Sequence, residues 1–347
     1  MPIYNNKKKI LKDRVPQATS SESDTSKKLT STVESSSSDI LEGAVDQFKS
    51  EQPHWDFSKV VLSEAVQIQL DAALDRVRYQ NILFEDWGLK EVDPKGSRSV
   101  INFYGLPGTG KSMSAEAIAN ELGRSIIKVS YAELESKYVG DTPKNIKRAF
   151  AAAKIQNAVI FFDEADSILG KRLSSVTQGA DHSVNVSRSV MLQEMDEFAG
   201  VVIFATNLAR NYDSAFVRRI HSHIKFELPN QQARESIFKQ MLVANLPLGP
   251  TVTPQYLAQI TEGLSGGDLR TVVINAAAKA VSRTGVDQVV KQVDFSTVID
   301  EIFKAKQEII GTTHEKKVSE ETVSVSQLPS DVKNCYDHVI NEPNHLV

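Results

Sequence analysis

Two kinds of hydrophobic pattern alternate along the middle of the chain. Runs of consecutive apolar residues are typical of strands buried on both faces of a sheet, and apolar residues at every third or fourth position are typical of helices. The runs predict strands over residues 99–104, 126–129, 158–162, 201–205 and 224–228. The helical pattern covers residues 60–77, 113–122 and 143–154. This alternation predicts an α/β fold in which helices cover both faces of a parallel sheet.

The pattern changes after Pro229, which ends the last predicted strand. Helices are predicted over residues 231–244, 254–262, 267–282 and 295–310, with no strand between them. We therefore expect an α/β domain over residues 51–228 and a second, smaller, all-α domain over residues 229–312.

The two ends of the chain lack this patterning. Residues 1–50 begin with a basic cluster and continue as a Ser-rich segment, which is typical of disorder, so ordered structure is expected to begin near His54. The basic cluster could contact nucleic acid or acidic lipid, but a solvated tail is the better interpretation. Residues 313–347 are polar and weakly patterned, and we expect a flexible tail there.

Composition excludes some classes of protein. The chain of 347 residues carries a net charge of −4 and one cysteine, Cys335. The charge gives no whole-chain indication of nucleic-acid binding, and one cysteine excludes an intramolecular disulfide and suits the reducing cytosol. No apolar run approaches the length of a transmembrane helix, and no secretory signal is recognisable. We expect a cytoplasmic protein without a transmembrane segment.

The most specific motif lies between a predicted strand and a predicted helix. From Gly105 to Ser112 the sequence fits G-x-x-x-x-G-K-[ST], the phosphate-binding loop. Its glycines allow the backbone to wrap around phosphate oxygens, and the helix N-terminus offers unpaired N–H groups. Lys111 is expected to reach the β- and γ-phosphates, and the Ser112 hydroxyl to hold Mg²⁺. The expected ATP-binding residues of this loop are Gly105, Leu106, Pro107, Gly108, Thr109, Gly110, Lys111, Ser112 and Met113.

Two acidic residues follow the apolar run 158–162. A buried strand of this kind delivers carboxylates to the edge of the sheet at which α/β proteins bind ligands. Asp163 is expected to hold Mg²⁺ and Glu164 to polarise the attacking water. The alternative is a strand end capped by solvated acids, which the preceding phosphate-binding motif makes the weaker interpretation.

Polar residues accompany two other predicted strands. Asn207 follows the run 201–205, where it could position the attacking water or contact the γ-phosphate, or occupy a strand-end turn. His221 and His223 precede the run 224–228. Because no third ligand is near them in the sequence, we interpret them as strand-edge residues and not as a metal site.

Together these motifs resemble those of the AAA ATPases, a family of the larger AAA+ group. The resemblance covers residues 55–310. Besides the phosphate-binding loop, four segments resemble motifs of the family. Residues 136–140 resemble the pore loop S-K-[YW]-V-G, and residues 161–166 resemble F-x-D-E-x-D. Residues 205–207 resemble sensor 1, and residues 263–268 resemble the G-x-S-G-A-D motif of a helical lid. The resemblance implies that the chain hydrolyses ATP with Mg²⁺ and assembles as a ring, usually a hexamer, with ATP between the subunits.

Residues 213–219 resemble the segment in which the family carries arginine fingers. This implies that Arg218 and Arg219 reach the γ-phosphate bound by the neighbouring subunit, where a finger raises the rate by about 10³–10⁵. The segment is more similar to the paired-arginine form of severing and membrane-extracting members than to R-P-G-R-x-D-R. Which of the two arginines is the main finger therefore stays open. Two surface arginines after a helix are the alternative.

The lid motif departs from the family pattern at two positions. Gly267 stands where the family usually carries Ala, and with Gly266 it would let the backbone approach adenine. Arg270 lies near the position of the sensor-2 arginine of many AAA+ proteins, which the main AAA branch lacks. A contact with the γ-phosphate and a position on the helix surface are equally compatible with the sequence.

The pore loop bears on the choice of substrate. The resemblance implies that Lys137, Tyr138 and Val139 line a central channel, in which Tyr138 grips an extended polypeptide. A tyrosine packed in the protein interior is the alternative.

These expectations indicate a homohexameric ring that remodels an unidentified protein client with ATP. A nucleic-acid-associated AAA+ ATPase, such as a loader or transposition helper, is a second possibility, which the aromatic pore loop disfavours. A non-hydrolysing scaffold is a third, which Asp163 and Glu164 disfavour.

Overall fold

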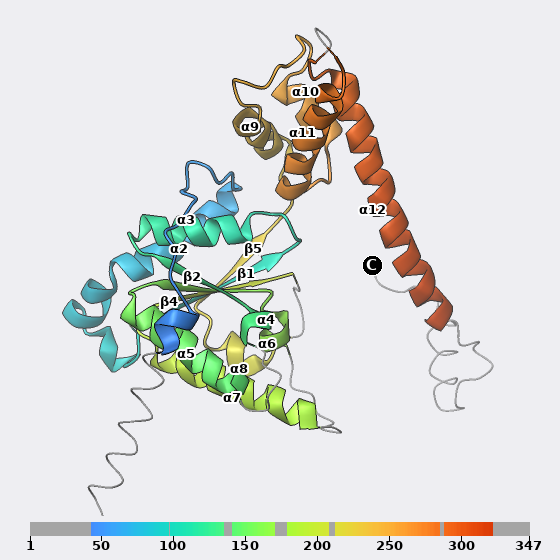
Figure 1. Cartoon of the computed structure of the whole chain (residues 1–347). Coiled ribbons are helices and arrows are strands. Elements are labelled where there is room, and N and C mark those ends of the chain that lie inside the picture. Colours follow the sequence, from blue (N-terminus) through green and yellow to red (C-terminus); the bar gives the residue numbers. More distant parts are fainter. Residues whose placement is uncertain are drawn as a thin grey trace, which may run out of the picture.

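The computed structural model describes residues 43–96, 98–134, 141–170, 179–207, 212–284 and 288–321 (Figure 1). Five parallel strands form one sheet in the order β2-β3-β4-β1-β5. Their bounds are β1 Ser99–Gly105, β2 Ile126–Ser130, β3 Val159–Asp163, β4 Val201–Thr206 and β5 Ser222–Phe226. Each predicted strand is therefore confirmed within about two residues, and so is the α/β fold class.

Helices cover both faces of this sheet because alternate strand residues point to opposite sides. On β4, Val202 and Phe204 join a core with α5 (Asp141–Ile155) and α7 (Gly179–Glu197), whereas Val201 and Ile203 join a core with α2 (Glu64–Arg78) and α3 (Lys111–Glu121). Figure 1 shows these two helical layers above and below the strands. The helices are α2 Glu64–Arg78, α3 Lys111–Glu121, α4 Tyr131–Leu134, α5 Asp141–Ile155, α6 Asp166–Leu169, α7 Gly179–Glu197 and α8 Ser214–Val217. A short π-helix, Ile82–Asp86, and a 3₁₀ turn, Leu89–Glu91, follow α2.

Helices α2 and α7 differ from the sequence prediction. The predicted helix 60–77 begins later, because Ser63 caps α2 by accepting a hydrogen bond from Val66 N at 3.4 Å, and residues 60–62 precede the helix. No prediction covered α7, whose Ser, Asn and Asp residues are poor helix formers. Its buried Met191 and Met195 belong to the core shared with α5, so tertiary packing stabilises this helix.

Ordered structure begins before the position expected from the sequence. Residues 43–47 are helical, and Ala44 and Phe48 are buried in the core with α5. Glu51 exchanges two backbone hydrogen bonds of 2.9 Å with Ile126 of β2, the strand at one edge of the sheet. The expectation of a disordered segment extending to residue 50 is therefore wrong for residues 43–50, and Glu51, which follows them, pairs with an otherwise open strand edge.

The remaining helices form a bundle with its own apolar core. They are α9 Gln231–Met241, α10 Pro254–Ile260, α11 Gly266–Val281 and α12 Gln292–Glu321. Phe238, Leu257 and Phe295 are fully buried between them. An isolated parallel bridge joins Leu248 to Val290. All four helices occur where they were predicted, while the domain boundary at residues 228–229 remains a prediction.

Helix α12 is longer than expected. It continues through Gly311 to Glu321, so residues 313–321, where a flexible tail was expected, are helical. A glycine costs a helix only about 1 kcal/mol, and the following Glu and Lys residues are good helix formers. In the described part of the chain, no helix combines the length and hydrophobicity needed to cross a membrane.

Candidate functional site

The phosphate loop connects β1 to α3, as its motif predicted. Gly105, Gly108 and Gly110 have φ values of +143°, +75° and +100°, a region that side chains other than glycine rarely adopt. A Cβ atom on Gly105 would lie 2.1 Å from the carbonyl oxygen of Phe226 in β5. This loop therefore needs glycine both for its turns and for its close approach to the neighbouring strand.

Lys111, the first residue of α3, is held inside the loop. Its Nζ donates hydrogen bonds to the carbonyl oxygens of Gly105 at 2.8 Å and Leu106 at 3.0 Å, and to Oδ1 of Asn207 at 2.9 Å. Burial lowers the pKa of Lys111, while Asp163 and the neighbouring acid Asp166 oppose that shift. The sequence-predicted Lys111 and Asn207 thus meet at one point, although 96 positions separate them.

The two residues predicted to hold Mg²⁺, Ser112 and Asp163, also lie next to each other. The Ser112 hydroxyl donates to Oδ2 of Asp163 at 3.3 Å, and the other carboxylate oxygen accepts from Glu164 N at 2.9 Å. Among the described residues, no three His, Cys, Asp or Glu side chains form a metal-binding group. A phosphate-loop Mg²⁺ needs fewer protein ligands, since phosphate oxygens and water supply the rest, and the hydroxyl–carboxylate pair fits that role.

Glu164 has an unusual backbone. Its φ is +51°, and Asn157 is the other non-glycine residue with positive φ in the described structure. The following residue is fixed, because Ala165 N donates to the carbonyl oxygen of Ala205 at 2.9 Å. The Glu164 side chain is exposed and lines the same cavity as Asp163. Strain of this kind persists where the surroundings enforce it and is common at functional sites.

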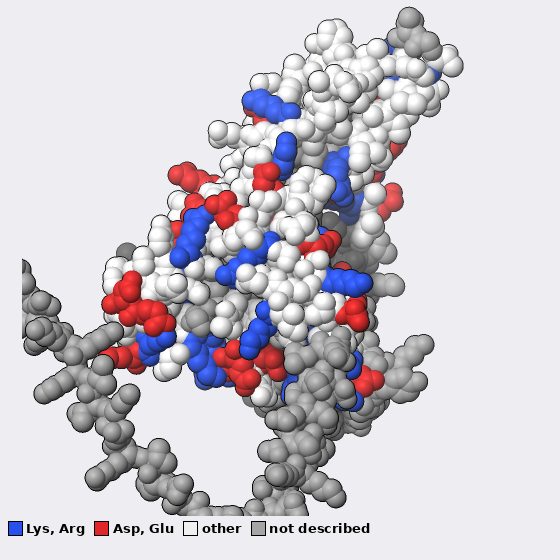
Figure 2. All heavy atoms as spheres, turned by 60° about the vertical axis from the view of Figure 1, so that its left-hand side comes forward, with Lys and Arg blue, Asp and Glu red and all other residues white. Residues whose placement is uncertain are grey.

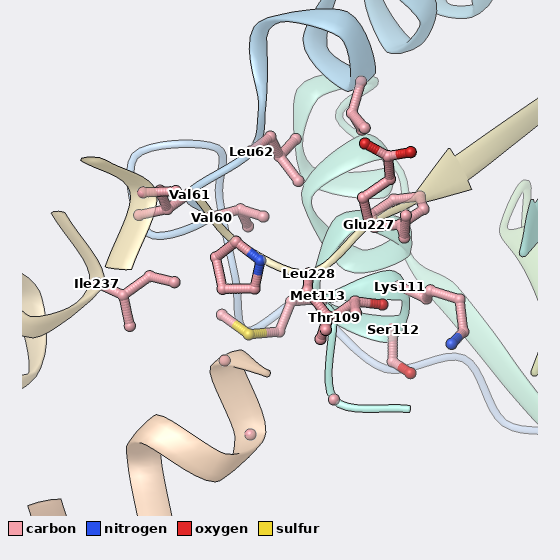
Figure 3. A pocket seen from close by; sticks show the side chains of 18 of the residues that line it. Val60, Val61, Leu62, Thr109, Lys111, Ser112, Met113, Glu227, Leu228 and Ile237 are labelled. Carbon is pink, nitrogen blue, oxygen red and sulfur yellow. The ribbon is translucent and has the colours of Figure 1, made fainter. Parts of the chain in front are cut away.

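A cavity of about 460 Å³ connects these groups with the helical bundle. Figure 3 shows Lys111 and Ser112 on one side and the apolar side chains of Val60, Met113 and Ile237 on the other. Residues 59–63, Leu228 and Ile237 line the cavity but were not predicted. The apolar run 60–62 was interpreted as helix. Its position just before the capping residue Ser63 is a signal that could have identified it.

The first turn of α11 also lines the cavity and faces the phosphate loop. Gly266, Gly267 and Arg270 all line it, so the structure brings the predicted lid residues to the phosphate loop. Gly267 N donates to the carbonyl oxygen of Gly108 at 2.9 Å. A Cβ on Gly267 would lie 3.2 Å from the Cα of Gly108, which explains why a residue without a side chain suits this position.

The two candidate finger arginines differ in their surroundings. Arg219 donates from Nε to Oδ2 of Asp196 at 2.9 Å and from Nη1 to the carbonyl oxygen of Ala215 at 3.0 Å. Arg218 is exposed, and no hydrogen bond or ion pair of its side chain is found within the described residues. Neither arginine lines the cavity, so neither reaches the Lys111 site of its own chain.

The histidines lie at the edge strand of the sheet. His223 is part of β5, and its Nδ1 lies 3.4 Å from the side-chain nitrogen of Asn102 in β1. His221 precedes β5, and its Nδ1 accepts a hydrogen bond from Val100 N at 3.1 Å. Burial, with the positive charges of Arg76 and Arg98, lowers the pKa of His221 from 6.5 to about 4. His221 therefore acts as a neutral hydrogen-bond acceptor.

The pore-loop residues lie outside the described residues. Lys137, Tyr138 and Val139 fall in the gap between residues 134 and 141, and their assignment remains a prediction.

Comparisons with known proteins agree with these motifs. Residues 101–228 match the family described as "ATPase family associated with various cellular activities (AAA)". The chain is 34% identical over 236 residues to a proteasome-activating nucleotidase of Methanopyrus kandleri, covering 66% of the chain and 52% of that protein. It is 35% identical over 206 residues to spastin of Drosophila melanogaster, covering 56% and 26%. It is 32% identical over 234 residues to the 26S proteasome regulatory subunit 4 homolog of Schizosaccharomyces pombe, covering 65% and 50%. The aligned part thus spans about half or less of these relatives.

Proposed function

We propose that the chain, which matches the AAA family of ATPases over residues 101–228, is an ATPase of that family and binds and hydrolyses ATP in the cavity between the phosphate loop and α11. The observation that carries this proposal is the convergence of Lys111 with Asn207 and of Ser112 with Asp163. These four residues come from three different parts of the sheet edge and meet at the mouth of one cavity. A chance glycine-rich turn would not be expected to gather them.

Each group has a role in this reaction. The loop N–H groups and Lys111 bind the phosphates, and the apolar residues Val60, Met113 and Ile237 offer a surface for the base. Ser112 and Asp163 would hold Mg²⁺, which would neutralise phosphate charge. Asn207 and Glu164 orient a water molecule whose oxygen forms a bond to the γ-phosphorus. The bond from that phosphorus to the bridging oxygen breaks, ADP leaves with the electron pair, and Glu164 accepts the proton of the water.

Arg218 is the better candidate for an arginine finger. Its side chain is exposed, whereas Asp196 and the Ala215 carbonyl engage Arg219 within the same chain. Because Arg218 does not line its own cavity, a catalytic role requires the cavity of a second copy. We therefore propose a ring, most simply a homohexamer, in which Arg218 stabilises the transition-state charge in the neighbouring site. Arg270 would contact the γ-phosphate from the lid side of the cavity.

The proposed substrate of the ring is a protein. The relatives include proteasome-activating and proteasome regulatory proteins, and the sequence of the loop 136–140 predicts an aromatic grip on a polypeptide. The alternative is an ATPase that acts on nucleic acid. Such proteins usually present a basic stripe, whereas Figure 2 shows Lys and Arg intermixed with Asp and Glu over the described residues of the face in view. A cytoplasmic location is part of the same proposal.

A trapping experiment tests this function. Glu164→Gln should bind ATP but hydrolyse it far more slowly, so a client should stay bound when the full chain is purified in the presence of ATP. A protein that is recovered with Glu164→Gln and lost with Glu164→Gln/Tyr138→Ala would support threading and identify the client. Material sensitive to nuclease would instead favour the nucleic-acid alternative. Normal turnover by Glu164→Gln would contradict the role given to Glu164.

A further inference from the structure

The N-terminus of α11 has a doubly bonded cap. Ser265 Oγ accepts a hydrogen bond from Asp268 N at 3.3 Å, and Oδ2 of Asp268 accepts from Ser265 N at 2.8 Å and from Ser265 Oγ at 2.7 Å. This reciprocal arrangement is a capping box, which ties the first turn of a helix to the residue before it. It fixes the rotamer of Ser265 and the direction of the first N–H groups of α11.

This cap lies directly against the phosphate loop. A Cβ atom on Gly108 would stand 2.6 Å from Ser265 Oγ, and one on Gly266 would stand 3.3 Å from the carbonyl oxygen of Gly108. The backbone bond from Gly267 to Gly108 continues the same contact. Since so little space separates the two segments, a rotation of Ser265 or a shift of the first turn of α11 would alter the wall of the nucleotide cavity.

A third element reaches the cap from outside the cavity. Lys306, near the middle of α12, places its Nζ 2.5 Å from Oδ2 of Asp268. Burial alone would raise the pKa of Asp268, but hydrogen bonds from Lys306 and Ser265 lower it overall. The same carboxylate oxygen therefore receives the ammonium of Lys306 and both donors of Ser265. Lys306 itself does not line the cavity.

We propose that Lys306 is a positioning residue for ATP: it fixes the Asp268–Ser265 cap against Gly108 and thereby couples α12 to the nucleotide cavity. This inference rests on ATP binding in that cavity, as proposed above. Helix α12 is about 45 Å long at 1.5 Å per residue, and its C-terminal half extends beyond the other helices of the bundle (Figure 1). A displacement of α12 would therefore reach the cap of α11 through Lys306 as well as through the apolar core that the two helices share.

A purely stabilising salt bridge would leave a different signature. A partly exposed ion pair, such as this one between α12 and α11, contributes little by itself, typically below about 1 kcal/mol. If Lys306 only held α12 against α11, its removal would lower the melting temperature without a specific change in ATP affinity. If it positions the cap, ATP affinity should fall even at temperatures at which the whole chain is folded.

The test compares two lysines of α12 in the full chain. Lys304 is exposed on the same helix and has no side-chain hydrogen bond or ion pair within the described residues, so Lys304→Met is the matched control. We expect Lys306→Met to raise the Kd of a fluorescent ATP analogue about two- to fivefold, Lys304→Met to leave it unchanged, and Lys306→Arg to restore most of the affinity. In the background of Asp268→Asn, Lys306→Met should have a smaller effect, because its partner is already altered.

Several outcomes would overturn the proposal. Unchanged affinity in Lys306→Met, or equal weakening by Lys304→Met, would show that Lys306 does not act through the cap. If Lys306→Met does not fold, Lys306→Gln takes its place, and unchanged affinity in that variant has the same meaning. Failure of the wild-type chain to bind the analogue would instead contradict the proposed function itself, so the two failures are distinguishable.

Discussion

The backbone N–H of Gly267 donates a 2.9 Å hydrogen bond to the carbonyl oxygen of Gly108. This bond joins the first turn of α11 to the phosphate loop, so two segments far apart in the sequence form one wall of the cavity. Gly108 has φ +75°, and a Cβ atom there would stand 2.6 Å from Ser265 Oγ. Both its backbone conformation and its contact with α11 require glycine.

Gly108→Ala should therefore weaken nucleotide binding strongly. Left-handed backbone costs a residue with a Cβ atom about 1–2 kcal/mol, and the displaced cap adds to that. We expect at least a tenfold rise in the Kd of an ATP analogue, since about 1.4 kcal/mol corresponds to tenfold. Gly123→Ala is the control, because Gly123 also has positive φ, +63°, but no atom lies within 4 Å of its added Cβ. Equal affinity in the two variants would contradict the role of the contact.

The sheet was predictable because its strands are buried on both faces. The runs that form β1, β3 and β4 contain few polar residues. Strands of a parallel sheet that helices cover on both faces need this composition, because side chains on both faces are buried. The proximity of the polar residues that follow these strands could be inferred in the same way, since the C-terminal ends of parallel strands meet at one edge, while their roles stay predictions. Lys111, Ser112, Asp163 and Asn207 are accordingly found together.

Other parts depend on contacts that local pattern does not reveal. The apolar residues 60–62 fit a helix pattern but line the cavity, because Ser63 starts α2 after them. The capping box of α11 is visible in the sequence, whereas the pairing of Asp268 with Lys306 spans 38 positions and depends on how α12 packs. Sequence spacing does not distinguish Arg218 from Arg219, whereas the structure does: Arg218 is exposed, and Arg219 is hydrogen-bonded to Asp196.

The strained backbone of Glu164 predicts a conflict between stability and activity. Asn adopts positive φ more easily than Glu does, so Glu164→Asn should stabilise the chain by about 0.5–1 kcal/mol while it abolishes hydrolysis. Thermal melting and phosphate release measure the two effects. Asn157→Ala is the companion variant: with φ +48° at that residue, it should lower stability without altering the chemistry of the cavity. A Glu164→Asn chain that is less stable than wild type would contradict this account.

The finger assignment predicts complementation between two inactive variants. Lys111→Ala should lose ATP binding in its own cavity, and Arg218→Ala should hydrolyse ATP about 10³-fold or more slowly because its neighbour's site lacks the finger. Mixed rings contain junctions at which an intact Arg218 meets an intact Lys111. Mixing the two variants should therefore restore part of the activity, measured as phosphate release at constant total protein.

Arg219→Ala provides the contrast. Asp196 also accepts from Arg98 Nη1 at 2.6 Å, and loss of Arg219 removes one of the two arginine partners that Asp196 has among the described residues. We expect a loss of stability of about 1 kcal/mol and a smaller loss of activity than in Arg218→Ala. If Arg218→Ala keeps full activity at every protein concentration, the finger assignment is wrong.

The lowered pKa of His221 predicts how the free energy of unfolding depends on pH below about 6.5. Its pKa is lowered from 6.5 to about 4, first by burial and then by Arg76 and Arg98, so the unfolded chain binds a proton more readily than the folded chain. Folding is therefore unaffected by this group above pH 6.5, and stability falls as the pH drops from about 6.5 towards 4. One pKa unit corresponds to about 1.4 kcal/mol. Because the imidazole is only partly buried, the expected loss is about 1–2 kcal/mol, less than the full shift implies.

His221→Asn isolates this contribution. The Asn oxygen can replace Nδ1 as the acceptor for Val100 N, but it has no proton to gain in this range. Urea denaturation of both chains between pH 4 and 7 should show a difference in unfolding free energy that is constant above pH 6.5 and shifts in favour of His221→Asn below it. The carboxylates titrate in both chains, so their effects cancel in the difference. Parallel profiles over the whole range would show that His221 keeps its ordinary pKa in the folded chain.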